Sequence, residues 1–119
     1  MSSISNMPIV NSPLPVESGS DYVWDRYQQS VRMSTYLVAF VVSKLQNIDM
    51  TRDDGLMLRI WADSNSIDQT GFAMDILPKI LKHFEGFFKL KFPLPKIDMI
   101  AIPDFAFGAM ENWGLITYT

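Results

Sequence analysis

One carboxylate stands alone in an apolar stretch near the end of the chain. Between Phe105 and Ile116, Glu111 is the only ionisable side chain. A carboxylate surrounded by apolar groups loses hydration unless it is paired or hydrogen-bonded, so Glu111 either faces water or binds a cation. Isolated carboxylates on loops are mostly solvated. The residue type alone therefore favours an exposed loop glutamate, and a cation-binding role needs a second argument.

The residues around Glu111 supply that argument. The stretch Gly108-Ala109-Met110-Glu111-Asn112-Trp113-Gly114 closely resembles the exopeptidase signature (the GAMEN motif) of the gluzincin aminopeptidases, the aminopeptidase N family. The resemblance continues upstream in three further stretches: Met33-Ser34-Thr35-Tyr36-Leu37-Val38-Ala39-Phe40, Phe92-Pro93-Leu94-Pro95-Lys96-Ile97-Asp98 and Ile102-Pro103-Asp104-Phe105. It is weakest from Asp49 to Ser66. The chain is thus similar to an interior fragment of a zinc aminopeptidase.

The resemblance implies a substrate-binding role for five consecutive residues: Gly108, Ala109, Met110, Glu111 and Asn112. Glu111 would hold the free α-ammonium group of a peptide, because a fixed carboxylate rewards a charged chain end and is left unpaired when an internal segment enters. Gly108 and Ala109 would let an extended peptide backbone approach closely. Met110 would line the pocket for the first side chain of the peptide, and Asn112 would brace Glu111 or its loop. For Met110 and Trp113, a role as core filler stays open.

The same resemblance implies that the complete enzyme uses zinc, held by His-Glu-x-x-His and a later Glu. In the family this motif follows the exopeptidase signature, and it is absent from the present sequence. We therefore expect zinc in the parent protein, and no catalytic residue, metal ligand or bound cofactor in this chain, which alone should be inactive. His83 lacks a second histidine at helical spacing and is interpreted as structural. The group Asp49, Asp53 and Asp54 lacks the spacing of a calcium loop and is interpreted as a solvated linker. Thr119 stands where the family usually has arginine.

The overall composition fits a folded protein and narrows its partners. The 119 residues are 48% hydrophobic and carry a net charge of −3, whereas nucleic-acid binding needs a basic face. The longest apolar run, residues 36–42, is far shorter than the roughly 20 residues that cross a bilayer as a helix, so no transmembrane segment is predicted in the fragment. The expected partners are peptide substrates with a free N-terminus.

Two apolar segments in the first half of the chain predict strands. Residues 22–28 and 35–43 are rich in aromatic and β-branched side chains, and we expect them to pair antiparallel. The second segment is apolar on both faces, so we expect a central strand that is covered on each side. The preceding residues 8–20, with three prolines, three serines, one asparagine and Gly19, favour a loop.

The second half predicts strands on either side of one helix. Residues 44–55 have few apolar side chains and end in Asp54-Gly55, a pair typical of a tight turn, so they form a candidate domain boundary. Residues 56–62, 97–102 and 115–118 are predicted strands. After the turn-forming residues 63–66 we expect an amphipathic helix that ends before Phe92-Pro93. Its apolar stripe comprises Ala73, Leu77, Ile80 or Leu81, Phe84 and Phe88.

These elements predict an α+β fold. The resemblance implies the closing strands of an all-β N-terminal domain at residues 1–48, and the start of a thermolysin-like zinc peptidase catalytic domain, with a mixed sheet and an amphipathic helix, at residues 49–119. It further implies part of a zinc-dependent metalloaminopeptidase that removes N-terminal residues from peptides, with this chain contributing the free-amine recognition loop. A non-catalytic peptide-binding or surface-receptor homologue is the alternative. The sequence leaves the location undetermined; the family suggests a membrane-anchored extracellular protein, with the cytoplasm as the alternative.

Overall fold

The computed structural model describes residues 1–10 and 14–119. In chain order its elements are β1 (Ser2–Ser5), β2 (Leu14–Pro15), β3 (Val23–Trp24), the 3₁₀ helix η1 (Thr35–Leu37), β4 (Phe40–Ser43), β5 (Gln46–Thr51), β6 (Met57–Ala62), the 3₁₀ helix η2 (Ile67–Gln69), α1 (Gly71–Phe88), β7 (Lys96–Ala101), β8 (Ala109–Met110) and β9 (Leu115–Tyr118). One helix and several sheets, one of them mixed, confirm the predicted α+β class.

A five-stranded mixed sheet forms the centre of the molecule. Its strand order is β5-β6-β7-β9-β8. The pairs β6/β7 and β7/β9 are parallel, whereas the outer pairs β5/β6 and β8/β9 are antiparallel. Parallel neighbours need a crossover connection, and α1 supplies it between β6 and β7. The three strands predicted in this half of the chain are confirmed to within one residue at each end.

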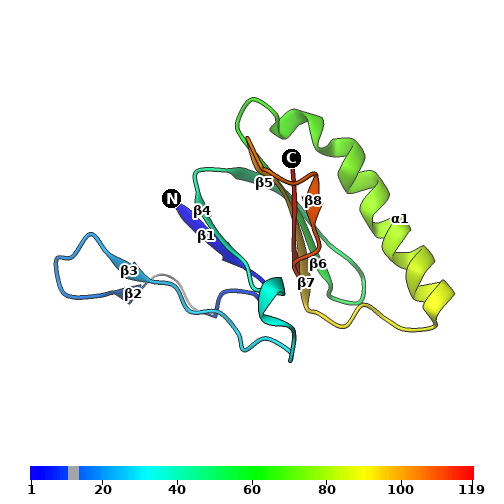
Figure 1. Ribbon diagram of the computed structural model, residues 1–119, viewed down its shortest axis with the longest axis horizontal. Coiled ribbons are helices and arrows are strands. Elements are labelled where there is room, and N and C mark those ends of the chain that lie inside the picture. The colour runs from blue at the N-terminus through cyan, green and yellow to red at the C-terminus, as the bar shows by residue number, and fades with distance from the viewer. Residues whose placement is uncertain (11–13) are drawn as a thin grey trace.

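Helix α1 covers one face of this sheet (Figure 1). Leu77, the buried residue of the helix, packs in a cluster with Leu58 of β6 and Ile97 of β7. Alternate residues of a strand point to opposite faces, so these strand residues define the helix-covered face. Phe84 and Phe88 are 49% and 61% exposed, so the outer part of the predicted apolar stripe does not pack on the sheet. The two rings stack on each other instead.

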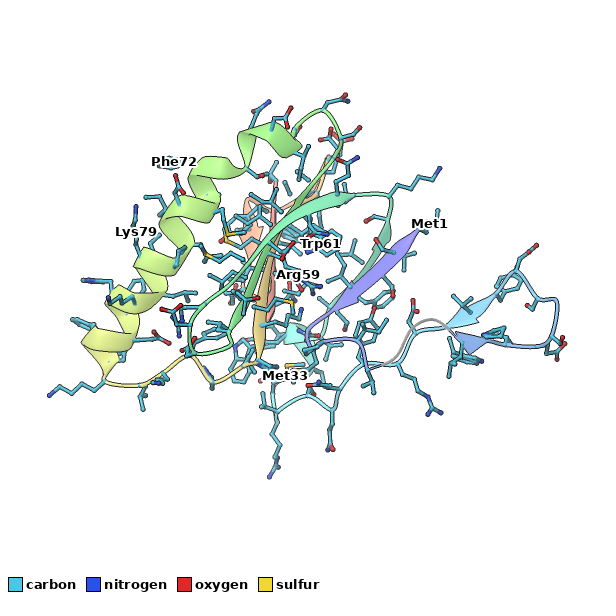
Figure 2. The ribbon with its side chains drawn as sticks, turned by 180° about the vertical axis from the view of Figure 1, so that it is seen from behind. Met1, Met33, Arg59, Trp61, Phe72 and Lys79 are labelled. Carbon is cyan, nitrogen blue, oxygen red and sulfur yellow. The ribbon has the colours of Figure 1, made fainter. Side chains whose placement is uncertain are left out.

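The opposite face of the sheet packs against a small two-stranded sheet of β1 and β4. Ile4 of β1 lies in a buried cluster with Trp61, Ile100 and Leu115, one residue from each of the three central strands. Figure 2 shows Trp61 and Arg59 on β6 in the middle of the molecule, with Phe72 and Lys79 out on the helix. The chain therefore has three layers: the β1/β4 pair, the mixed sheet and α1.

The strand pairing predicted for the first half is wrong. Residues 22–28 and 35–43 do not pair with each other: β3 pairs with β2, and β4 pairs with β1. Residues 35–37 form η1 rather than strand, and the side chains of Phe40 and Val42 are exposed instead of covered. Strand content was inferred from local composition, but the partner depends on the first five residues, whose serine-rich sequence gives no strand signal. The β2/β3 pair projects from the rest of the molecule (Figure 1).

Two segments interpreted as loop or linker contain strands. Leu14–Pro15 of the predicted loop at residues 8–20 form β2, and residues 11–13 of that loop lie outside the described part of the chain. The segment 44–55 contains β5, whose antiparallel ladder with β6 overrides its low apolar content. The tight turn at Asp54-Gly55 is confirmed, with Gly55 at a φ of 88°. The boundary predicted between residues 48 and 49 falls inside β5.

An ion network joins the β5–β6 turn to the end of α1. Arg52 donates to both Asp54 and Glu85, and the amide of Phe92 donates to the Glu85 carboxylate at 2.8 Å. The guanidinium of Arg52 lowers the pKa of Asp54 to about 2 and, together with the Phe92 amide, lowers the pKa of Glu85. This network fixes the course of the chain from the helix into β7.

Candidate functional site

The five residues predicted to bind substrate lie together at one edge of the mixed sheet. Ala109 and Met110 form β8, which pairs with Tyr118 and Thr117 of β9 and is the last strand of the sheet. Within the described residues, the other edge of β8 has no strand partner. Gly108 precedes the strand, and its carbonyl accepts a hydrogen bond from the amide of Thr119 at 3.1 Å. An extended backbone beside this edge would therefore meet unpaired main-chain groups.

Glu111 follows β8 directly and is exposed. Among the side chains that the structure describes, Glu111 forms no hydrogen bond and no salt bridge, whereas its neighbour Asn112 is 6% exposed. The carboxylate is therefore accessible on a backbone whose next residue is buried. This geometry agrees with the solvated glutamate that residue type alone suggested, and it also leaves the carboxylate available to a cation from solution.

Two surface hollows meet at Glu111. A cavity of about 330 Å³ is lined by Glu111, Asn112 and mostly apolar side chains that include Phe92, Leu94 and Ile116. A second hollow of about 490 Å³ has Glu111 and Trp113 on one side and residues 32–34 and 36–37 on the other. Trp113 lines both hollows and is 44% exposed, so it belongs to their walls and not to the hydrophobic core. A ligand in either hollow can reach the carboxylate.

Asn112 braces the loop and not the Glu111 side chain. Its Nδ2 donates to the carbonyl of Leu37 at 3.3 Å, and its own carbonyl accepts from the amide of Leu115 at 3.0 Å. Leu37 belongs to η1, in the segment where the sequence resembles the aminopeptidases. Among the described residues, Asn112 has no hydrogen bond to the Glu111 side chain, and its role as a brace stays a prediction.

Beneath the loop of residues 111–114 lies a buried ion pair that was not predicted as part of the site. Lys96 and Asp98 of β7 are 1% and 0% exposed and pair with each other. Asp98 also accepts from Arg59 and from the indole of Trp61 at 2.8 Å. Burial lowers the pKa of Lys96, and the adjacent carboxylate of Asp98 opposes that shift. Since removing one member of such a pair leaves an uncompensated charge, each member depends on the other.

Lys96 also binds the loop itself. Its ammonium group donates to the carbonyl of Gly114 at 2.8 Å and to the carbonyl of Ser5. The sequence indicates the pairing of Lys96 with Asp98, because two opposite charges at alternate positions of an apolar strand must share one buried face. For Asn6, which contacts the same loop, the sequence held no such signal.

The described residues do not form a metal centre. Within residues 1–10 and 14–119, no three His, Cys, Asp or Glu side chains come together in a way that could hold an ion. His83 lies exposed on α1 with its ring against Phe84, and Asp49 is exposed on β5. The residues present thus do not fit a zinc ion. In addition, no helix of the described part has the length and apolar character needed to cross a membrane.

Comparison with known proteins finds a similarity to one peptidase family. Residues 72–119, which contain nearly all of α1, the buried ion pair and Glu111, match the family model described as "Peptidase family M1 domain". This part of the chain is thus similar to the domain of peptidase family M1.

Relatives align along almost the whole chain. Over 97% of its length, the chain is 44% identical to endoplasmic reticulum aminopeptidase 2 of Bos taurus, 42% identical to endoplasmic reticulum aminopeptidase 1 of Homo sapiens and 45% identical to aminopeptidase M1 of Arabidopsis thaliana. The chain spans only 12% to 13% of the length of these relatives. The resemblance to the aminopeptidases is therefore confirmed, and it extends well upstream of residue 72.

Proposed function

We propose that this chain is the free-amine recognition part of a zinc-dependent aminopeptidase that removes N-terminal residues from peptides. The observation that carries the proposal is Glu111, an exposed carboxylate without a partner among the described residues, at the end of an edge strand and between two hollows. A peptide whose α-ammonium group binds Glu111 can extend its backbone along β8 by strand addition. An internal peptide segment offers no charge to this carboxylate, which accounts for selection of chain ends.

The proposed contributions of the neighbours follow from their positions. Gly108 has open space where a side chain would stand, so a peptide backbone can approach it. Met110 lies opposite Thr117 and is half-buried, so it would present only part of its side chain to the first residue of the substrate. Asn112 would hold the loop through Leu37. Hydrolysis belongs to zinc and ligands outside this chain, so binding and orientation of the substrate are the chemistry proposed for these residues.

The proposed domain arrangement follows the family. Residues 1–48 would close an all-β N-terminal domain, and residues 49–119 would begin a thermolysin-like catalytic domain. Two of the named relatives are endoplasmic reticulum aminopeptidases, which favours the endoplasmic reticulum over the cytoplasm as the location. Microscopy of the tagged complete gene product with an endoplasmic reticulum marker tests the location, and a diffuse cytoplasmic signal would reject it.

The experiment replaces the carboxylate in the complete gene product that contains this chain. Glu111→Gln keeps the size of the side chain and removes its charge. A charge-assisted hydrogen bond contributes about 1.5–3 kcal/mol, so we expect kcat/KM for alanine and leucine 4-nitroanilides to fall by roughly 10- to 100-fold. Glu17 is an exposed glutamate between β2 and β3. Glu17→Gln is therefore the matched control and should leave activity unchanged.

Two results would contradict the proposal. Unchanged turnover in the Glu111→Gln protein would remove the amine-binding role. A complete gene product that binds peptides with a free N-terminus, cleaves none of them, and lacks His-Glu-x-x-His after residue 119 would instead identify a non-catalytic peptide-binding homologue.

A further inference from the structure

Asn6, which follows β1, is buried where the N-terminal segment meets the recognition loop. Both amide hydrogens and the carbonyl oxygen of its side chain form hydrogen bonds. Nδ2 donates to the carbonyl of Trp113 at 2.7 Å and to the carbonyl of Leu37 at 2.8 Å, and Oδ1 accepts from the amide of Ala39 at 2.9 Å. Asn6 is 5% exposed, so water cannot replace these bonds easily. Only a primary amide offers two donors and one acceptor at this size.

Two of these bonds connect Asn6 with the segment that follows Glu111, one directly at Trp113 and one through Leu37. The carbonyl of Leu37 accepts from both Asn6 and Asn112, so one atom of η1 joins the N-terminal segment to the loop. On the other side of Glu111, Met110 is fixed by its pairing with β9. The backbone at Glu111 is therefore held from both sides, while its side chain has no bond of its own among the described residues.

The backbones of Asn6 and Gly114 approach each other closely. A Cβ atom at Gly114 would lie 2.2 Å from the backbone oxygen of Asn6. Lys96 donates to the carbonyls of both Gly114 and Ser5, and so ties the same two segments together at the residue after Trp113 and the residue before Asn6. The loop can move relative to the N-terminal segment only by breaking these contacts.

We propose that Asn6 is a positioning residue for amine recognition: it sets the place of the Glu111 carboxylate by fixing Trp113 and Leu37. The inference rests on the proposed function of Glu111. A misplacement of about 1 Å at a reacting group can reduce a rate by about 100-fold, so a distant clamp of this kind matters to activity even though it touches no substrate.

The test is Asn6→Asp in the complete gene product. This change keeps the shape but replaces two donors by an acceptor that faces two carbonyl groups. We expect kcat/KM for alanine 4-nitroanilide to fall by roughly 10-fold or more, mainly through a higher KM. Asn47→Asp makes the same chemical change on an exposed residue of β5 and should leave both constants unchanged.

A double substitution separates positioning from a general structural role. If Asn6 acts through Glu111, then Asn6→Asp in a Glu111→Gln background should change kcat/KM by less than about 2-fold, because the group that it positions is already neutralised. Equal losses in both backgrounds would overturn the inference. If Glu111→Gln alone has no effect, the proposed function fails; if Glu111 matters and Asn6→Asp does not, the present inference alone fails.

Folding is checked by circular dichroism and by the thermal midpoint of each variant. If the Asn6→Asp protein does not fold, the KM of the Asn6→Ser protein is measured instead, because serine keeps one donor and introduces no charge. A folded Asn6→Ser protein with an unchanged KM overturns the inference. So does failure of both variants to fold, since Asn6 would then be required for the structure as a whole.

Discussion

Gly114 offers the sharpest test of how the segment after Glu111 is held. Its φ is 75°, in the left-handed region, and a Cβ atom there would lie 2.2 Å from the backbone oxygen of Asn6 and 3.4 Å from Leu94. Gly114→Ala therefore imposes both backbone strain and a collision with main-chain atoms. Gly55 is the matched control, because its φ is 88° and nothing lies within 4 Å of the position that a Cβ would take.

The cost of Gly114→Ala can be estimated from these contacts. An alanine in the left-handed region costs about 1–2 kcal/mol, and Gly55→Ala should cost no more than this. To reach even 3.0 Å, the loop and Asn6 must separate by 3.0 − 2.2 = 0.8 Å. That shift strains the neutral bond from Asn6 to Trp113, worth about 1 kcal/mol, and the charged bond from Lys96 to Gly114, worth about 1.5–3 kcal/mol. The sum for Gly114→Ala is roughly 3–6 kcal/mol.

Hydrogen exchange in the complete gene product measures the local loss of stability around residue 114. The amides of Asp98 and Leu115 bond to the carbonyls of Gly114 and Asn112. Since 1.4 kcal/mol corresponds to a factor of ten, their exchange should be about 100-fold faster or more in Gly114→Ala, and unchanged in Gly55→Ala. Equal protection of the two amides in both variants would refute the reasoning, because it would mean that the loop absorbs the collision without losing its bonds.

Three further substitutions test the stability of the surrounding fold. Lys96→Met leaves the buried Asp98 with fewer partners and should lower stability by about 3 kcal/mol, measured as a shift of the urea midpoint. Glu85→Gln should lower the thermal midpoint near neutral pH and reduce the further fall of that midpoint on acidification below pH 4.5. The folded-state pKa of Glu85 lies below its ordinary value of 4.5, so the stabilisation by this carboxylate is present above pH 4.5 and is lost as the pH falls through the folded-state pKa. Gly86→Ala, on the exposed side of α1 with open space around it, should raise stability by about 0.5–1 kcal/mol in the same urea titration.

The parts of the fold with a periodic local signal were predictable from sequence. The strands β6, β7 and β9 consist of short apolar runs between turn residues, and α1 has apolar residues at helical spacing, so local pattern and final structure agree. Strand β5 was missed because its residues are mostly polar and exposed, and only its ladder with β6 makes it a strand. The partner of β4 was missed for a related reason: β1 is serine-rich, and Ile4 alone carries its packing.

The site divides in the same way. The sequence motif predicts residues 108–112 as the binding residues. Asn6 and Lys96, which bond to the following residues Trp113 and Gly114, are distant in sequence and are recognised only by contact. Asn6 and Leu37 come from the segment assigned to the N-terminal domain, while Lys96 and Gly114 come from the segment assigned to the catalytic domain. The loop is therefore held by both segments at once. A border near residue 48 would separate two domains along the chain, whereas the carbonyls of Trp113 and Gly114 accept hydrogen bonds from both sides of that border.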